Sequence, residues 1–226
     1  MVDYKIVVKG SNFKFVEGTI GFANLVLLET SDGPILFDTG HYGNRRVLQK
    51  ALKEAGMTPD DIGAVVLSHL HYDHSINVDL FPKAQIYLSQ KEWDYAGSPH
   101  PEDTSIPWKI RELLGEFQVT LIDDDRDIAK GVHFFQAPGH TPGSAALALE
   151  TKRGTVVLAG DAIKYPKEIL RKCPDLAFDA PEVGPKSISK ILDMADVIVP
   201  GHFGEVCRCA EQFVWEEDST LSLVAR

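Results

Sequence analysis

The feature that most constrains this chain is the segment Ser68–His74, which reads Ser-His-Leu-His-Tyr-Asp-His and directly follows the apolar stretch Ala64–Leu67. A short apolar stretch of this kind predicts a buried strand. Alternate residues of an extended chain face the same way, so His69 and His71 are expected to converge just past that strand. If the chain turns after Tyr72, Asp73 and His74 lie beside that point, but their side chains point in a different direction. The spacing therefore predicts ligands for two adjacent metal ions rather than four ligands for one.

Three later segments also end a predicted strand with a candidate ligand. They are His140 after Val132–Ala137, Asp161 after Val156–Ala159, and His202 after Val197–Val199. Together with the Ser68–His74 segment they make four strand-end positions, which hold five of the eight histidines in the chain. Ligands carried at one end of several strands, on loops kept tight by glycine and proline, are how a scaffold assembles a metal site. Neutral imidazole and carboxylate groups suit zinc, manganese and iron.

The rest of the pattern predicts strands with interposed helices in both halves of the chain. The further strands are expected at Lys5–Lys9, Phe13–Gly18, Ala23–Thr30, Pro34–Phe37, Ile86–Leu88, Gln118–Ile122 and Ser144–Glu150, and the helices at Asn44–Ala55, Lys91–Tyr95 and Lys186–Met194. This order predicts an α/β (α+β) fold in which two sheets pack together with helices outside. We expect residues 1–226 to form a single domain.

Charge and composition restrict the partners of the chain. It carries 23 lysines and arginines against 33 aspartates and glutamates, a formal charge of −10, which disfavours nucleic acid and anionic membranes. No apolar run approaches the roughly 18 residues of a spanning helix, and the N-terminus lacks a secretory signal, so a cytoplasmic location is expected. Three cysteines fit a reducing compartment. The tail Glu205–Trp215 could be an edge strand or the interface of a homo-oligomer.

An ordered set of seven side chains resembles the metallo-β-lactamase superfamily of binuclear metallohydrolases. The set is His69, His71, Asp73, His74, His140, Asp161 and His202, and Phe37–Gly40 matches the first motif of the family. The resemblance implies a four-layer αβ/βα sandwich. It also implies a first metal held by His69, His71 and His140, and a second held by Asp73, His74 and His202. Asp161 would bridge both metals, and Asp38 would orient ligands without binding metal.

The same resemblance implies a metal-dependent hydrolase, closest in its motifs to lactonase and thioesterase members. Two divalent ions, zinc first and manganese or iron as alternatives, would share a hydroxide that attacks the carbonyl carbon of a small ester, lactone or thioester. Asp73 would serve catalysis by protonating or stabilising the leaving group. Two alternatives stay open. A phosphodiesterase or nuclease is opposed by the acidic balance, and a mononuclear-iron persulfide dioxygenase is opposed by the complete second set of ligands.

Residues that would contact the substrate are less constrained by the pattern. Lys164 and Tyr165 lie just past the bridging aspartate and could polarise a carbonyl or bind a carboxylate, although a solvated loop explains them equally well. His41 could line the rim of the pocket or be an exposed turn residue. Tyr72 alternates with the ligands and is expected to point into the core, and Trp108 could close over a small-molecule substrate.

Overall fold

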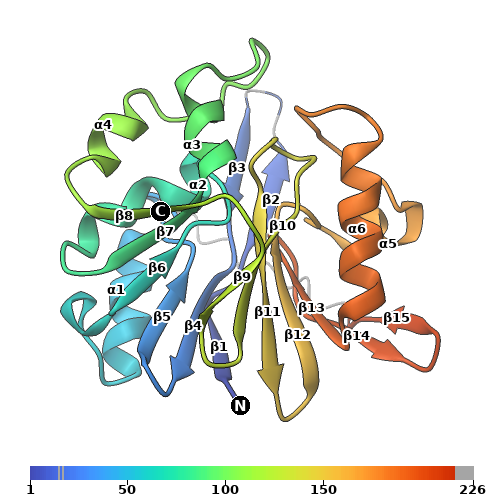
Figure 1. Ribbon diagram of the computed structural model, residues 1–226, viewed down its shortest axis with the longest axis horizontal. Coiled ribbons are helices and arrows are strands. Elements are labelled where there is room, and N and C mark those ends of the chain that lie inside the picture. Colours follow the sequence, from blue (N-terminus) through green and yellow to red (C-terminus); the bar gives the residue numbers. More distant parts are fainter. Residues whose placement is uncertain (15, 17, 217–226) are drawn as a thin grey trace.

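Two β-sheets lie face to face between outer helices in the computed structural model of this chain, which describes residues 1–14, 16 and 18–216 (Figure 1). Helices α1, α3 and α4 cover one sheet and α5 and α6 cover the other. The helices are α1 Arg45–Glu54, α2 Tyr72–Ser75, α3 Gln90–Gly97, α4 Ile110–Leu114, α5 Pro166–Arg171 and α6 Val183–Met194, with short 3₁₀ turns at Pro59–Asp61 and Ile76–Leu80. The predicted four-layer α/β sandwich is confirmed.

The first sheet has six strands in the order β1-β4-β5-β6-β7-β8. They are β1 Asp3–Val8, β4 Leu25–Thr30, β5 Gly33–Phe37, β6 Ala64–Val66, β7 Gln85–Ser89 and β8 Gln118–Ile122. Strands β5 to β8 run parallel, so the carboxyl ends of β5 and β6 open at the same edge of the sheet. The loops that leave this edge carry Asp38 and the histidine motif.

The second sheet has seven strands in the order β15-β14-β13-β12-β11-β10-β9. They are β9 Arg126–Ala129, β10 Val132–Gln136, β11 Ala145–Thr151, β12 Gly154–Gly160, β13 Val197–Pro200, β14 Val206–Cys209 and β15 Gln212–Val214. Strands β12 and β13 pair in parallel, which brings the ends that carry Asp161 and His202 together. The tail Glu205–Trp215 forms the hairpin β14–β15 at one edge of this sheet.

Three apolar clusters hold the layers together. The central one joins both sheets, with Phe37 and Val66 from the first and Phe134 and Leu158 from the second. The other two clusters pack α1, α3 and α4 against the first sheet and α5 and α6 against the second. Burial of apolar surface on both faces of each sheet fixes the register of its strands, because a one-residue slip would expose every buried side chain. The strand ends that bear the site are thereby placed on a rigid frame.

A separate two-stranded hairpin differs from the prediction. The sequence indicated one strand over Phe13–Gly18, whereas the structure has β2 Ser11–Lys14 paired with β3 Thr19–Phe22. Residues 15 and 17 lie outside the described residues. Strand β3 was not predicted, because its mixed sequence Thr-Ile-Gly-Phe shows little alternation. The hairpin belongs to neither large sheet, and β3 lies against the predicted ligands.

Candidate metal centre

The predicted ligands meet at the strand ends where the two sheets open. Strand β6 leads into His69 and His71, and α2 then turns the chain through Asp73 and His74. His140 follows β10, whereas Asp161 and His202 follow the parallel pair β12 and β13. All seven side chains are buried, with exposed fractions from 0% to 8%. The tertiary fold thus brings together residues that are spread over more than a hundred positions of the sequence.

Four of these side chains form a first group. The group consists of His69, His71, His140 and Asp161, whose candidate ligand atoms all lie within 4.8 Å of one another. His140 Nε2 lies 3.0 Å from His71 Nδ1 and 3.3 Å from Asp161 Oδ2. His69 Nε2 lies 4.0 Å from the same carboxylate oxygen. Three imidazoles and one carboxylate oxygen therefore surround a single point.

A second group, Asp73, His74 and His202, lies directly beside the first. Its ligand atoms also fall within 4.8 Å of one another, and His202 Nε2 is 3.6 Å from Asp73 Oδ2. The other oxygen of Asp161, Oδ1, lies 3.2 Å from His74 Nε2 and 3.1 Å from His202 Nε2. Asp161 thus turns one carboxylate oxygen toward each group.

The donor atoms fit a pair of divalent cations. Within the described ranges, His69 Nε2, His74 Nε2 and Asp161 Oδ1 are buried atoms without a hydrogen-bond partner. Leaving a buried polar atom unsatisfied costs about 1–3 kcal/mol. These three atoms face the interior of the two groups, where a cation would satisfy them together. Histidine nitrogen and carboxylate oxygen are ligands that zinc, manganese and iron accept.

Asp38 supports the second group from behind. Its Oδ2 accepts a hydrogen bond from His74 Nδ1 at 2.7 Å, and its two oxygens also accept bonds from the Ser68 backbone and hydroxyl at 2.7 and 2.8 Å. The contact keeps the proton of His74 on Nδ1 and leaves Nε2 free to face Asp161. Asp38 adopts a left-handed backbone conformation, with φ of 59°, at the turn that makes this approach.

Two of the other histidines are held by backbone carbonyls. His140 Nδ1 donates to Leu176 O and His202 Nδ1 donates to Phe22 O, both at 3.0 Å. Each bond fixes the ring so that Nε2 points into the centre. The carbonyls belong to the segment after α5 and to β3, and neither position carries a recognisable signal in the sequence.

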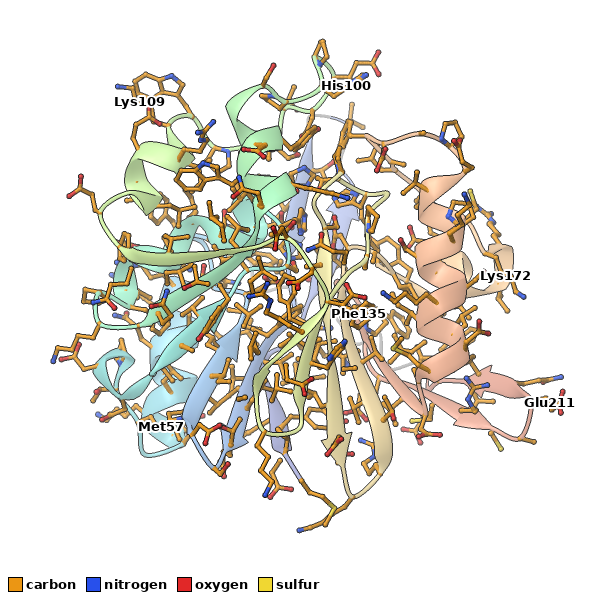
Figure 2. All side chains as sticks on the ribbon, in the orientation of Figure 1. Met57, His100, Lys109, Phe135, Lys172 and Glu211 are labelled. Carbon is orange, nitrogen blue, oxygen red and sulfur yellow. The ribbon has the colours of Figure 1, made fainter. Side chains whose placement is uncertain are left out.

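Asp103 was missed by the sequence analysis. It lies in the turn-rich loop after α3, where its buried Oδ2 accepts hydrogen bonds from His71 Nε2 at 3.0 Å and from the Tyr95 hydroxyl at 2.7 Å. Burial opposes ionisation of this carboxyl, but the hydrogen bond and charge of His71 hold its pKa below the usual value. His100, on the outer part of the same loop (Figure 2), lies with its ring 5.9 Å from that of Phe178.

Glu92 was also missed, although it links the two motif loops. Its side chain is fully buried on α3, where Oε1 accepts a bond from the Leu70 backbone at 2.9 Å and Oε2 accepts one from the Thr141 hydroxyl at 2.6 Å. Leu70 stands between two predicted ligands, and Thr141 follows a third. A carboxylate inside a predicted helix gives no sequence signal for such a contact, because its partners lie 22 and 49 positions away.

The surroundings lower the pKa of some of the imidazoles and raise the pKa of others. Burial, aided by neighbouring positive groups, holds the pKa of His69 and of His140 well below 6.5, so both rings are neutral, as metal binding requires. Burial also disfavours charge on His74, but the carboxylates of Asp161, Asp38 and Asp73 outweigh it and raise the pKa of His74 well above 6.5. For Asp161, burial is likewise outweighed, by His202, His74 and a nearby lysine, and its pKa lies well below the usual value.

The candidate substrate residues differ in their burial and in their contacts. Lys164 is buried, 7% exposed, with Nζ 3.5 Å from Asp161 Oδ2, which excludes the alternative of a solvated loop. The half-buried Tyr165 is the N-cap residue that precedes α5, and its ring centre is 6.2 Å from that of His202. His41 is half-buried: Nε2 donates to Gly21 O and Nδ1 accepts from Gly43 N, both at 3.0 Å.

Two aromatic residues depart from their predictions. Tyr72 does not point into the core, because it is half-buried and packs edge-on against the ring of His41 at 5.5 Å. Trp108 is 88% exposed, and its ring contacts the Lys109 ammonium at 4.7 Å. An indole this exposed does not cover the ligand atoms.

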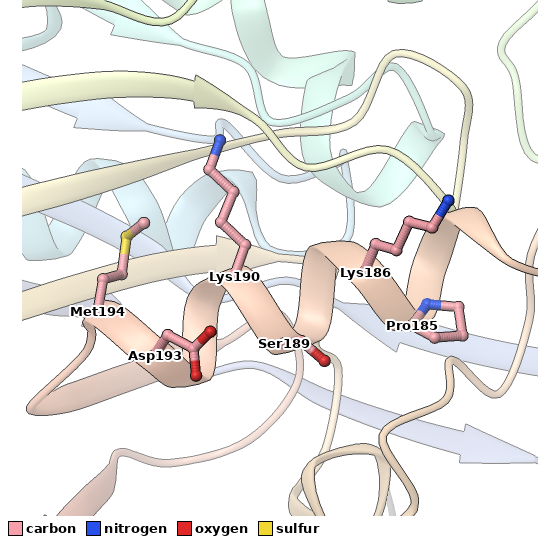
Figure 3. A pocket seen from close by; sticks show the side chains of 6 residues that line it. All are labelled: Pro185, Lys186, Ser189, Lys190, Asp193 and Met194. Carbon is pink, nitrogen blue, oxygen red and sulfur yellow. The ribbon is translucent and has the colours of Figure 1, made fainter.

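A shallow groove of about 660 Å³ runs along α6, apart from the ligands. It is lined by Pro185, Lys186, Ser189, Lys190, Asp193 and Met194 (Figure 3). Lys190 is paired there with Asp125 at 2.7 Å. None of the predicted site residues lines this groove.

Two packed sheets with paired histidine and aspartate groups at one edge define a binuclear metallohydrolase, and comparisons with known proteins agree. The sequence profile of the metallo-beta-lactamase superfamily matches residues 18–202. N-acyl homoserine lactonase AiiA of Bacillus thuringiensis subsp. kurstaki is 31% identical over 193 residues, 74% of each chain. Metallo-beta-lactamase domain-containing protein 1 of Mus musculus is 33% identical over 184 residues, 80% of this chain and 64% of the mouse protein.

A solved structure supports the same fold. AidC, a dizinc quorum-quenching lactonase in complex with the product N-hexanoyl-L-homoserine, aligns with a TM-score of 0.67 at 24% identity, over 91% of this chain and 83% of its own. The chain therefore belongs to the metallo-β-lactamase superfamily, as its motifs predicted, and it is a metal-dependent hydrolase with a dinuclear metal site. Among the helices of residues 1–14, 16 and 18–216, none is long and apolar enough to cross a membrane.

Proposed function

We propose that this chain hydrolyses a lactone or a closely related small ester with two zinc ions. The observation that carries the proposal is Asp161, whose two oxygens lie between the two groups of ligands, at 3.3 Å from His140 Nε2 and 3.1 Å from His202 Nε2. The lactonases among the relatives, one of them dizinc, favour this substrate class and this metal. We also propose that residues 1–226 form one catalytic domain, and a cytoplasmic location stays a prediction.

The ligand roles follow the two groups. We assign His69, His71 and His140 to the first metal, Asp73, His74 and His202 to the second, and Asp161 to both. A divalent pair of this kind would supply a Lewis acid and would lower the pKa of a bound water to about 7. The protein holds the imidazoles in the required tautomers through Asp38, Asp103 and two backbone carbonyls.

Ring opening needs a proton at the leaving oxygen. Water oxygen adds to the carbonyl carbon, the bond from that carbon to the ring oxygen breaks, and the proton lost by the water ends on the new alkoxide. We propose Asp73 as the carrier of this proton, because at 8% it is the most solvent-exposed of the predicted ligands. It thus combines the role of ligand with that of proton carrier.

Lys164 is the group best placed to hold the substrate carbonyl oxygen. Its ammonium is almost buried and lies 3.5 Å from Asp161, so it is fixed beside the reacting groups. A preorganised cation in a site from which water is largely excluded stabilises developing negative charge more strongly than it would in water. Tyr165 lies near His202 and His41 lies near β3, and we propose that they shape the wall of the pocket.

Neither alternative has comparable support. An iron oxygenase with one metal would not need the second group of ligands, which is complete here. A nuclease would need positive surface, whereas the chain has a net charge of −10.

A substrate panel on protein of measured metal content tests the proposal. We expect two zinc ions per chain and turnover of acyl lactones and aryl esters that exceeds turnover of a chromogenic phosphodiester. Chelation should abolish the activity and zinc should restore it. Asp161→Ala, which removes the shared carboxylate, should bind less than one equivalent of zinc and be inactive. Faster phosphodiester cleavage, or one iron per chain with oxygen consumption, would overturn the proposal.

A further inference from the structure

Strand β3 lines the side of the second ligand group that the two large sheets leave open. Phe22 O accepts the hydrogen bond from His202 Nδ1 at 3.0 Å. The carbonyl of the neighbouring Gly21 accepts a bond from His41 Nε2 at 3.0 Å. The strand is thus fastened at successive residues to groups in or next to the second site.

Gly21 lies directly against the carboxylate of Asp73. A Cβ atom placed on Gly21 would lie 2.7 Å from Asp73 Oδ2, closer than real Cβ contacts, and 3.7 Å from His202 Cε1. Gly21 is not among the glycines with positive φ, so an alanine could adopt its backbone conformation. What the glycine supplies is therefore room for the carboxylate rather than conformational freedom.

The oxygen that a methyl group would displace is the one that faces the metal position. Asp73 Oδ2 lies 3.6 Å from His202 Nε2, so this oxygen is turned toward the other ligands of the second group. His202 cannot follow a displaced carboxylate easily, because its other nitrogen is bonded to β3 itself. The first group has no comparable contact with Gly21, whose three nearest atoms belong to Asp73 and His202.

We infer that Gly21 is a positioning residue for the second metal: the missing side chain lets Asp73 stand against strand β3 with one oxygen aimed at the second site. The inference rests on the proposed dinuclear function. It assigns the β2–β3 hairpin, which belongs to neither large sheet, to the wall of the metal centre. A side chain at position 21 should selectively weaken the second site and spare the first.

Zinc titration of Gly21→Ala against a chromophoric chelator tests the inference. We expect the first equivalent to bind as in the unsubstituted protein and the second to bind about 10–100-fold more weakly. Ile20→Ala is the matched control, since Ile20 is the preceding residue of β3 and its side chain is 46% exposed. The control should bind two equivalents with unchanged affinities. Unchanged affinity for the second zinc in Gly21→Ala would overturn the inference.

A double-substitution cycle on metal-free protein separates this contact from a general effect on folding. If alanine at position 21 collides with the Asp73 carboxylate, Gly21→Ala should lower the midpoint of thermal unfolding more in the natural background than in an Asp73→Ala background. Equal losses in both backgrounds, or failure of both variants to fold, would mean that alanine disturbs something else and would overturn the inference. Should only the single variant fail to fold, rescue by Asp73→Ala would support it.

Failure of the proposed function would be recognised separately. In that case the unsubstituted protein itself would bind fewer than two metals or hydrolyse none of the acyl substrates. If it binds two metals and hydrolyses them while Gly21→Ala behaves identically, only the inference about β3 fails.

Discussion

Asp103 accepts a hydrogen bond from His71 Nε2 at 3.0 Å, so a loop that follows α3 decides which nitrogen of His71 faces the metal centre. The bond leaves Nδ1 of His71 opposite His140 Nε2, also at 3.0 Å. Asp103→Ala should free the His71 ring and weaken binding of the first metal by about 10–100-fold, with a parallel loss in kcat/KM. Zinc titration and steady-state kinetics on the same preparations measure both effects.

Glu102→Ala is the matched control for Asp103, because Glu102 is the adjacent carboxylate of the same loop and is exposed. It should leave zinc affinity and activity unchanged. Tyr95→Phe removes the hydroxyl that donates to Asp103 Oδ2 but keeps the bond from His71, and it should produce an intermediate loss. Equal behaviour of Asp103→Ala and Glu102→Ala would contradict a role for Asp103 in orienting His71.

Lys164→Met should separate catalysis from metal binding. The substitution keeps an unbranched side chain that is one atom shorter, and it removes the charge that lies 3.5 Å from Asp161. If this charge stabilises the reacting carbonyl oxygen, kcat should fall by about 10²–10³-fold while zinc content stays at two per chain. Kinetics with a lactone and metal analysis of the same sample provide the measurement.

Lys186→Met, which alters an exposed lysine on α6, should leave kcat unchanged. A rise in KM alone would show that Lys164 binds the substrate without assisting the reaction.

The metal centre could be predicted from the sequence because its signals are local. Each predicted ligand lies within a few residues of the end of a strand, either in the loop that follows it or in the short helix α2. Parallel pairing of β12 with β13 then brings Asp161 and His202 together without any further information. The arrangement of helices around two sheets followed in the same way from runs of apolar residues.

The supporting contacts could not be predicted, since they depend on tertiary packing. Asp103 and Glu92 are carboxylates in a turn-rich loop and in a helix, and nothing in their neighbourhood distinguishes them from solvated residues. Strand β9 was also missed, because its residues are largely polar and it lies at the edge of its sheet. Lys164 illustrates the same limit: its segment looks solvated, yet packing against the strand ends buries it.

Glu92 should make the stability of the metal-free protein depend on pH. Burial raises the pKa of this carboxyl above its usual value of 4.5. A group with a raised pKa in the folded state contributes stability that is fully present below pH 4.5 and is lost as pH rises through the folded-state pKa. Glutamine does not ionise, so Glu92→Gln does not lose this stability. The unfolding free energy of Glu92→Gln minus that of the unsubstituted protein should therefore increase between pH 4.5 and 7.5. Urea unfolding at several pH values tests this, and a difference that does not change with pH would contradict it.

Removal of metal should destabilise the protein through the groups that it leaves unpaired. The centre buries seven imidazole and carboxylate side chains within two adjoining groups, and three of their ligand atoms have no hydrogen-bond partner among the residues that the structure describes. A ligand that binds only the folded state adds about 4.1 kcal/mol when present at 1,000 times its dissociation constant. For a chain of this length each kcal/mol corresponds to about 2–4 °C, so chelation should lower the unfolding midpoint by roughly 8–16 °C for each zinc site at that zinc excess. Thermal unfolding with zinc, with chelator, and after zinc is restored gives the measurement.

Asp161→Asn should show a much smaller shift, because its amide nitrogen cannot coordinate one of the two metals. If the midpoint of the unsubstituted protein does not respond to the chelator, these side chains do not form a metal centre that stabilises the fold.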